Sequence, residues 1–147
     1  MPVQLSASEI GTFLEEVFPQ VEGDFVIEKV TENAARVRLV TREKHLRPGG
    51  TISGPSMFAL ADVAAYIVTL AMIGRQALAV TTNCSIDFMR KPAAGKDLIA
   101  EATLLKLGRQ LAVTDVRIRS DGSAQLVARA GLTYALPPRP AGNAVKA

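Results

Sequence analysis

The sequence predicts an α+β domain in which an antiparallel β-sheet wraps around one long, buried α-helix. Residues 55–73 are apolar on nearly every side, and they lie between Pro55, at the first turn of a helix, and Gly74, just after its end. Strand-like runs follow, separated by segments rich in Pro, Gly, Asp and Ser, at residues 77–90, 98–106, 110–119 and 125–136. Short turns between consecutive strands favour antiparallel pairing of neighbours. The helix needs a cover on its apolar surface, and such a sheet supplies it.

The segment before this helix predicts a shorter helix and a hairpin. Ser6 stands three residues before Glu9, the spacing of a capping box, and apolar residues then recur at helical intervals. We therefore expect an amphipathic helix over residues 7–18. Residues 25–40 alternate between apolar and polar around a Glu-Asn pair suited to a turn, which is typical of a β-hairpin.

The composition favours one compact domain over residues 1–136. The chain has 147 residues, 48% of them hydrophobic, which indicates a single core. Residues 137–147 are rich in Pro and Gly, and we expect a disordered tail there. The first residues carry neither the basic segment nor the apolar stretch of a secretory signal, so we expect a cytoplasmic protein. Asp62 lies inside the long apolar helix and argues against a membrane span.

The distribution of basic residues indicates which kind of ligand the protein could bind. The net charge is +3, and basic residues occur singly or in pairs such as Arg90-Lys91, which argues against a nucleic-acid duplex and favours a small polyanion. Aromatic residues make up 5% of the chain and tryptophan is absent, so single-stranded nucleic acid would find few stacking platforms. Cys84 is the single cysteine and His45 the single histidine, the latter expected to be exposed in a loop over residues 41–54. An intramolecular disulfide and a Cys/His zinc site are thereby excluded.

Asp62 is the most informative residue of the central helix. Burying a carboxylate without partners costs several kcal/mol, so its presence among apolar neighbours needs a reason. It could pair with a structural partner such as an arginine. It could instead act as a catalytic base or nucleophile in a partly desolvated cleft. The residues alone leave both interpretations open.

The start of the same helix is a second candidate site. The first N–H groups of a helix have no acceptor within it, and its positive dipole end stabilises a developing oxyanion. Gly54 would let a ligand approach the backbone without a Cβ in the way, whereas Pro55 has no N–H. Plain helix initiation is the alternative interpretation.

The spacing of the two candidates limits how they could cooperate. Gly54 and Asp62 are eight residues apart. A helix rises about 1.5 Å per residue, so they lie roughly 12 Å apart along it. A reacting carbonyl must lie within about 3 Å of both its donor and its attacking group, so one subunit cannot supply both. If two subunits pack with antiparallel central helices, the Gly54 end of one approaches the Asp62 region of the other, and a twofold dimer gives two equivalent sites.

Several segments together resemble a known family. They are GGTISGPSMFALAD at residues 49–62, DFMRKPA at residues 87–93, Gly108-Arg109, and ARAGLTY at residues 128–134. Their order and spacing are similar to those of the hotdog-fold acyl-CoA thioesterases of the phenylacetic-acid-pathway (PaaI-like) branch. The resemblance covers about residues 24–136. It implies a hotdog fold, a homodimer or a dimer of dimers, and hydrolysis of an aryl- or medium-chain acyl-CoA without a metal or bound redox cofactor.

The resemblance also implies roles for individual residues. Gly54 looks like the glycine whose N–H polarises the thioester carbonyl. Asp62 looks like the acid that attacks as a nucleophile or activates water, and Thr81 is similar in place to a Ser or Thr that positions the water or the carboxylate. The substrate-binding candidates, which would hold the thioester or the phosphates of coenzyme A, are Arg47, Ser53, Arg90, Lys91 and Arg109.

The chain departs from the family pattern just before the central helix. Where many relatives have His-Gly-Gly, it has Ser53-Gly54-Pro55, although a Ser53 hydroxyl can cap the helix and preserve the Gly54 N–H. Where relatives often have Asn, it has Arg47, which could donate to the thioester oxygen, bind a phosphate or pair with Asp62. An ion pair of that kind would favour a non-catalytic protein that binds acyl-CoA or another small ligand. Hydratase chemistry is a further alternative, but it generally needs a site histidine, and His45 lies ahead of the buried helix.

Overall fold

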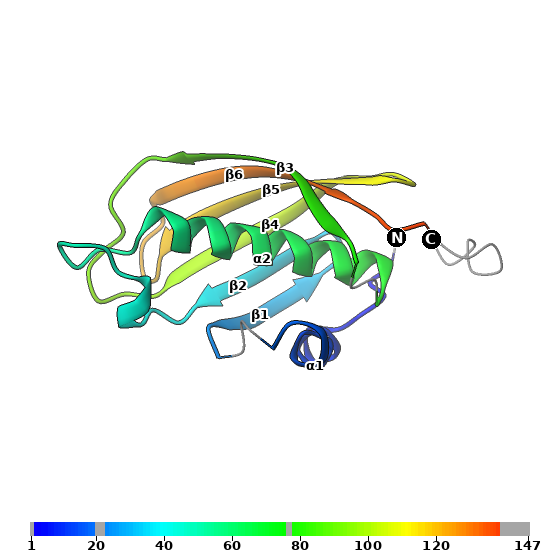
Figure 1. The fold of residues 1–147 in the computed structure, drawn as a ribbon, viewed down its shortest axis with the longest axis horizontal. Helices are drawn as coiled ribbons and strands as arrows, with labels where there is room; N and C mark the ends of the chain where they lie inside the picture. Colours follow the sequence, from blue (N-terminus) through cyan, green and yellow to red (C-terminus); the bar gives the residue numbers. More distant parts are fainter. Residues whose placement is uncertain (1, 20–22, 76–77, 139–147) are drawn as a thin grey trace.

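The computed structural model describes residues 2–19, 23–75 and 78–138. The elements are α1 (Ala7–Val17), β1 (Phe25–Thr31), β2 (Ala34–Leu39), the 3-10 turn η2 (Glu43–His45), α2 (Gly54–Ile73), β3 (Val80–Phe88), β4 (Leu98–Leu107), β5 (Leu111–Ser120) and β6 (Leu126–Ala135). The strands form one antiparallel sheet in the order β1-β2-β4-β5-β6-β3, and α2 lies across one of its faces (Figure 1). The predicted architecture is confirmed, whereas most of the predicted tail, residues 139–147, lies outside the described residues.

The core of the molecule is built around α2. The helix runs for 20 residues, and nearly all of its side chains from Leu60 onward are buried. It is long and apolar enough to cross a membrane by composition alone, but 78% of its most apolar stretch is buried within this chain. The sheet buries this helix with one of its faces. In β5, for example, buried residues alternate with more exposed ones, so the buried side chains face α2 while Arg117 and Arg119 point to the other face.

The local signals before α2 give the predicted elements. Ser6 and Glu9 form the reciprocal capping box of α1, in which the Glu9 N–H donates to the Ser6 hydroxyl at 3.1 Å and the Ser6 N–H donates to Glu9 Oε1 at 2.9 Å. β1 and β2 form the predicted hairpin. At its turn Asn33 has a φ of 60°, a left-handed conformation that asparagine tolerates better than most residues.

The pairing of β3 differs from the prediction. We expected consecutive strands to pair, but β3 pairs with β6 at one edge of the sheet, and β4 pairs with β2 and β5. Residues 89–97, which connect β3 to β4, are longer than the loops that usually close hairpins. They cross the end of the sheet from its edge to its centre. The first strand after α2, β3, is therefore an edge strand and does not pair with the next strand, β4.

The loop before α2 is more ordered than predicted. Residues 43–45 form the turn η2, and Leu46 bridges to Ile52. His45 is 8% exposed, so the expectation that it is exposed is wrong. Its Nδ1 accepts a hydrogen bond from the Arg42 N–H at 2.9 Å, and its carbonyl accepts from the Ser53 N–H at 2.8 Å. Burial lowers the pKa of His45, so the ring is uncharged near neutral pH. Its hydrogen bonds stabilise the loop that leads into α2.

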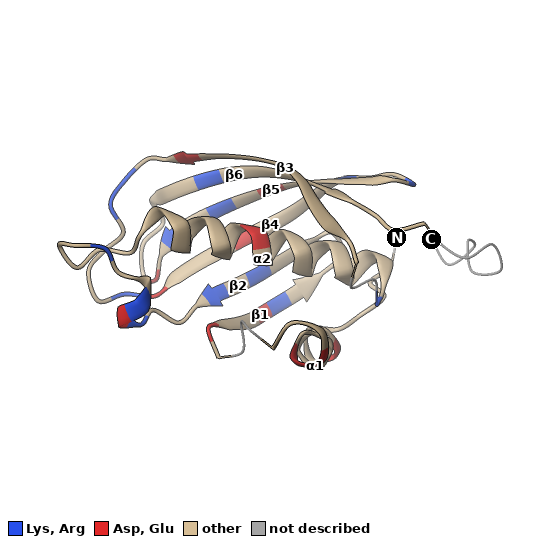
Figure 2. Cartoon of the chain, in the orientation of Figure 1, with Lys and Arg blue, Asp and Glu red and all other residues tan. Residues whose placement is uncertain are grey.

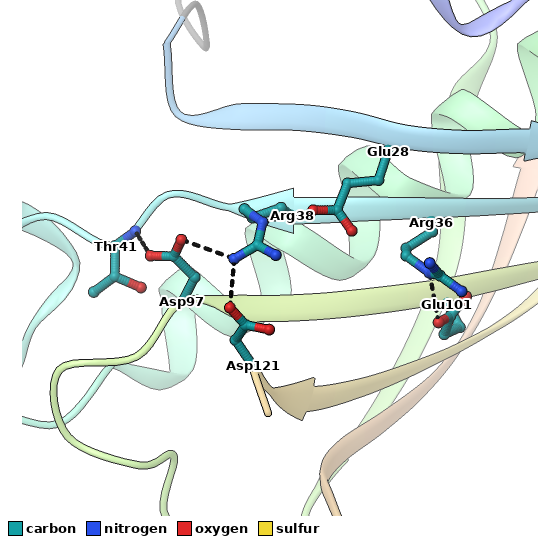
Figure 3. Close-up of polar contacts among 7 residues, drawn as sticks. All are labelled: Glu28, Arg36, Arg38, Thr41, Asp97, Glu101 and Asp121. Atoms are coloured by element: carbon teal, nitrogen blue, oxygen red, sulfur yellow. Dashed lines mark hydrogen bonds and ion pairs between the residues drawn. The ribbon is translucent and has the colours of Figure 1, made fainter. Parts of the chain in front are cut away.

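An ion-pair network joins the strands on the outer face of the sheet (Figure 3). Arg38 on β2 contacts three carboxylates, those of Glu28 at 2.6 Å, Asp97 at 3.1 Å and Asp121 at 2.8 Å. Asp97 also accepts from the Thr41 N–H at 3.0 Å. The Arg38 guanidinium lowers the pKa of Asp121. One side chain thus joins β1, β2 and the turns at one end of β4 and β5.

We expect Arg38→Gln to lower the free energy of unfolding by about 1 kcal/mol at neutral pH, because three carboxylates lose a shared cation. Since Arg38 depresses the folded-state pKa of Asp121, the part of the stabilisation that Asp121 contributes is fully present above the unfolded Asp pKa of about 4 and is lost as the pH falls through the lower folded value. Urea unfolding at several pH values measures it. Arg109→Gln, at an exposed arginine in the turn after β4, is the control, and an equal loss in both variants would contradict the assignment.

Candidate active site

Asp62 lies half-buried on α2 and is the only charged residue between Gly54 and Ile73. Figure 2 shows the corresponding single acidic band on an otherwise uncharged helix. The Thr81 hydroxyl donates to Asp62 Oδ1 at 2.6 Å. The Tyr134 hydroxyl lies 2.7 Å from the same Oδ1 and 2.9 Å from the Asp62 carbonyl oxygen. Within the described parts of the chain Oδ2 accepts no hydrogen bond, so one carboxylate oxygen is anchored and the other is open.

Strand pairing brings the two hydroxyl donors together. Thr81 on β3 lies directly opposite Tyr134 on β6. Side chains of directly opposed residues lie on the same face of a sheet, here the face that packs on α2. The register shifts between Thr81 and Asn83, where β3 has one extra residue. Bulges of this kind re-aim side chains near functional sites.

Tyr134 is suited to be a permanent donor. Its side chain is buried, and both this burial and the negative charge of Asp62 raise the pKa of the Tyr134 phenol. The hydroxyl therefore keeps its proton over the physiological range. The Tyr66 ring stacks on the Tyr134 ring with centroids 5.9 Å apart, which restricts the orientation of the phenol.

A cavity of about 320 Å³ opens beside Asp62. Its walls come from the end of α1, the middle of α2, the start of β3 and the end of β6. They consist of Val17, Phe18, Asp62, Val63, Tyr66, Ala79, Val80, Thr81 and Tyr134. Apart from the carboxylate and the hydroxyl groups, the lining is apolar. We call this space the Asp62 cavity.

A second and separate cleft of about 440 Å³ lies at the start of α2. Its lining includes Gly54 and three basic residues, Arg47, Arg90 and Lys91. At this helix start the Ser56 N–H donates to the Ser53 hydroxyl at 3.2 Å and the Met57 N–H donates to the Ser53 carbonyl at 3.1 Å. Because Pro55 has no N–H, the Gly54 N–H is the donor of the first turn that has no acceptor within the described residues. We call this space the basic cleft.

The comparisons with known proteins agree with this geometry. A family model described as the thioesterase superfamily matches residues 49–127, which include both Gly54 and Asp62. The chain belongs to the thioesterase superfamily. Its sheet and central helix are the hotdog fold of that superfamily, as the resemblance implied.

Individual relatives of this superfamily member cover most of its length. A crystal structure from Silicibacter sp. TM1040, named provisionally as a thioesterase, is 54% identical, has a TM-score of 0.88, and is matched over 94% of this chain and 96% of that one. The phenylacetic acid degradation protein PaaI from Thermus thermophilus is 28% identical, with a TM-score of 0.69 over 81% of this chain and 99% of that one. Acyl-coenzyme A thioesterase 13 from Homo sapiens is 26% identical over 76% of this chain and 79% of that protein.

The predicted site residues of this superfamily member fall into two groups. Asp62 and Thr81 lie together, and Gly54, Arg47, Arg90 and Lys91 lie together at the basic cleft. Ser53 caps α2 next to that cleft. Arg109 is apart from the basic cleft, since it precedes β5 at the end of the sheet where β3 starts, while Arg90 and Lys91 follow the other end of β3.

The structure answers the question that Arg47 raised. Arg47 lines the basic cleft, while the Asp62 carboxylate is bonded to Thr81 and Tyr134. No ion pair between Arg47 and Asp62 occurs among the described residues. The ion pair that would favour a neutralised, non-catalytic carboxylate is therefore absent from the described residues.

Sequence reasoning missed Tyr134 as a site residue. The only signal was its place at the end of the segment ARAGLTY, which contributed to the family resemblance. Cys84 is half-buried, and this burial, followed by the nearby charge of Asp62, raises the pKa of its thiol.

We expect no phenolate in the folded protein at pH values where an exposed tyrosine ionises. The chain has two tyrosines, Tyr66 and Tyr134, and burial raises the pKa of both. Folding raises the pKa of these phenols above their unfolded-state pKa of about 10. The folded state therefore becomes less stable relative to the unfolded state as the pH rises past about 10, so phenol ionisation and alkaline unfolding should coincide. Phenolate absorbance followed together with circular dichroism measures this, and Tyr134→Phe isolates Tyr66. Phenolate formation in a fully folded chain near pH 10 would contradict the burial argument.

Proposed function

We propose that this protein hydrolyses acyl-CoA thioesters of the aryl or medium-chain class. The observation that carries the proposal is the half-buried Asp62, whose Oδ1 accepts two hydroxyl hydrogen bonds and whose Oδ2 is open beside an apolar cavity. The thioesterase superfamily and the relative named acyl-coenzyme A thioesterase 13 support the same reaction class. The basic cleft supplies positive charge for the phosphates of coenzyme A.

The arrangement around Asp62 suits an acid that acts through one oxygen. Thr81 and Tyr134 fix the carboxylate plane through Oδ1, so Oδ2 has a defined direction.

In hydrolysis with Asp62 as a general base, Oδ2 takes a proton from water while the water oxygen bonds to the thioester carbonyl carbon. The carbonyl electrons move to its oxygen, where a backbone N–H stabilises them, and they return as the carbon–sulfur bond breaks. The thiolate leaves and takes a proton. With Asp62 as nucleophile, Oδ2 itself bonds to the carbon and coenzyme A leaves as the thiolate. Water then cleaves the resulting anhydride, which releases the acid and restores the Asp62 carboxylate, and the proton lost from the water goes to the thiolate.

The N–H that stabilises this oxyanion must come from a second subunit. Gly54 and Asp62 of one chain lie roughly 12 Å apart along α2, and they line different cavities. The edge strand β3 offers the surface for a partner, because its outer backbone edge is unpaired within the sheet and its end residues Val80 and Phe88 are 56% and 52% exposed. We propose a homodimer in which two β3 strands pair antiparallel, with a dimer of dimers as the higher assembly.

Antiparallel pairing of β3 would complete both sites at once. Thr81, at the start of β3, bonds to Asp62. Phe88, at the other end of β3, lies against Gly54, since a Cβ added at Gly54 would meet the Phe88 ring at 3.4 Å. When two such strands pair antiparallel, the start of one faces the end of the other, so the Asp62 cavity of one subunit meets the basic cleft of its partner.

We expect Asp62→Asn to lower kcat for phenylacetyl-CoA and octanoyl-CoA by about 100-fold or more, because the amide cannot accept a proton or attack the carbonyl. Release of free thiol measures the rate, and thermal unfolding shows that the variant is folded. Calorimetry with the same thioesters provides the comparison. Tight binding by the wild type with no turnover above the Asp62→Asn level would replace the hydrolase by the binding protein described above.

We expect mixed dimers to recover activity from two inactive chains. Gly54→Ala adds a methyl group next to the N–H at which we expect the thioester oxygen to bind. The Phe88 ring, 3.4 Å from that Cβ, is in ordinary van der Waals contact with it, so the variant should fold. After unfolding and refolding together in equal amounts, Gly54→Ala and Asp62→Asn chains should give about a quarter of wild-type activity, because half of the dimers carry one site with both groups intact. Chains refolded separately and then mixed on ice are the control. If the mixture stays as inactive as its components, the two groups do not act across subunits.

A further inference from the structure

A second apolar cavity lies under α1, next to the Asp62 cavity. It has a volume of about 270 Å³ and lies between α1, β1 and α2. Phe18 and Val63 are wall residues of both cavities. The two spaces therefore meet at these side chains, with the Asp62 carboxylate on one side and the space under α1 on the other. We call this second space the α1 groove, with walls that include Gly11, Leu14, Phe25, Ile27, Val63 and Ile67.

The chemistry of the α1 groove suits a hydrocarbon chain. No lysine or arginine is among the residues that line it, in contrast to the basic cleft. Its carboxylate, Glu15, is exposed on α1, as is Ser8, so the polar groups lie at the rim. Leu14, Val63 and Ile67 supply apolar surface from the two helices, and the side chains of the β1 wall are also apolar. Burying methylene groups against such surface is favourable, whereas a phosphate would lose its hydration without a partner.

Gly11 keeps this groove open in the middle of α1. A Cβ built at Gly11 would meet no atom within 4 Å. Glycine lowers the stability of a helix interior relative to alanine, and the backbone of Gly11 is not in the left-handed region that would require glycine. The helix therefore has neither a packing clash nor a backbone conformation that accounts for this glycine. A larger side chain here would enter the groove.

We propose that the α1 groove binds the distal part of an aliphatic acyl chain whose thioester carbonyl lies at Asp62. The inference rests on the proposed function and adds its preferred substrate, an unbranched acyl group too long for the Asp62 cavity alone. In the proposed dimer the coenzyme A phosphates lie in the basic cleft of the partner subunit. The acyl chain leaves the carbonyl in the opposite direction, through the Asp62 cavity and past Phe18 and Val63. The compact aryl group of phenylacetyl-CoA ends before this junction.

The test fills the α1 groove from Gly11. Gly11→Leu adds a side chain to open space on a helix, so the fold is retained and α1 becomes more helical. We expect its kcat/KM for decanoyl-CoA to fall at least about 10-fold further than its kcat/KM for butyryl-CoA or phenylacetyl-CoA, since losing even one methylene contact in an apolar pocket costs about that factor. Gly11→Ala should show a smaller change in the same direction.

The matched control is Thr12→Leu, which adds a similar side chain to an exposed position of the same helix. It should leave the ratio of the two rates unchanged. A fall in Gly11→Leu that is equal for short and long chains, or no fall at all, overturns the proposal. The wild type gives a second measurement that needs no variant. Its kcat/KM should continue to rise from hexanoyl-CoA to decanoyl-CoA, and a decline over that range also overturns the proposal.

A binding experiment separates this inference from the proposed reaction. In the Asp62→Asn background, calorimetry should show that Gly11→Leu weakens binding of decanoyl-CoA about 10-fold or more and changes binding of butyryl-CoA far less. If the wild type hydrolyses no thioester but this difference in binding is found, the hydrolase proposal fails and the acyl groove stands. If the wild type hydrolyses both thioesters and the difference is not found, only the groove is wrong.

Discussion

The arrangement of α2 against β3 and β6 depends on the hydrogen bonding of one carboxylate, that of Asp62. Asp62 interrupts a helix that is otherwise apolar, and a carboxylate in that position is tolerated only if donors come to it. The donors are hydroxyl groups of Thr81 and Tyr134, which come from two neighbouring strands. Neither donor is charged, so no cation is paired with this carboxylate among the described residues. The sheet thus does more than cover α2, because its edge pair of strands also supplies the hydrogen bonds of this half-buried acid.

The same arrangement divides the chemistry of the molecule between the two ends of β3. Positive charge that could meet an anion lies where β3 ends, at Arg90, Lys91 and Arg47. It lies beside the Gly54 N–H, which has no acceptor within the described residues. Apolar surface and the single acid gather where β3 begins. A rigid helix keeps the two ends apart, so no side-chain movement within one chain can join them. One end is basic and the other is largely apolar, which matches the proposed substrate, anionic at one end and apolar at the other.

How far the sequence predicts this molecule depends on the range of the interactions. Local signals were sufficient for α2, for the capping box of α1 and for the hairpin, and Gly54 and Asp62 stood out as groups with unmet hydrogen-bonding needs inside a single helix. Tyr134 could not stand out, because it is 72 residues from Asp62 and meets it only through strand order. The pairing of β3 with β6 depends on a connection that crosses the sheet, so nothing local predicts it. His45 was misjudged because its loop is polar in sequence, yet the chain folds back and encloses the ring.

The extra residue in β3 has a consequence for how this strand could change. In a regular strand, Thr81 and Cys84 would point to opposite faces, because their positions differ by three, an odd number. The bulge after Thr81 lets the Thr81 hydroxyl reach Asp62 while Cys84 pairs with the buried Leu132 and packs on the core. A shortened β3 without residue 82 would have to give up one of these, either the hydroxyl over the acid or the packing of its second half. Length at this point is therefore constrained more tightly than amino-acid identity, and insertions or deletions should be far rarer here than substitutions.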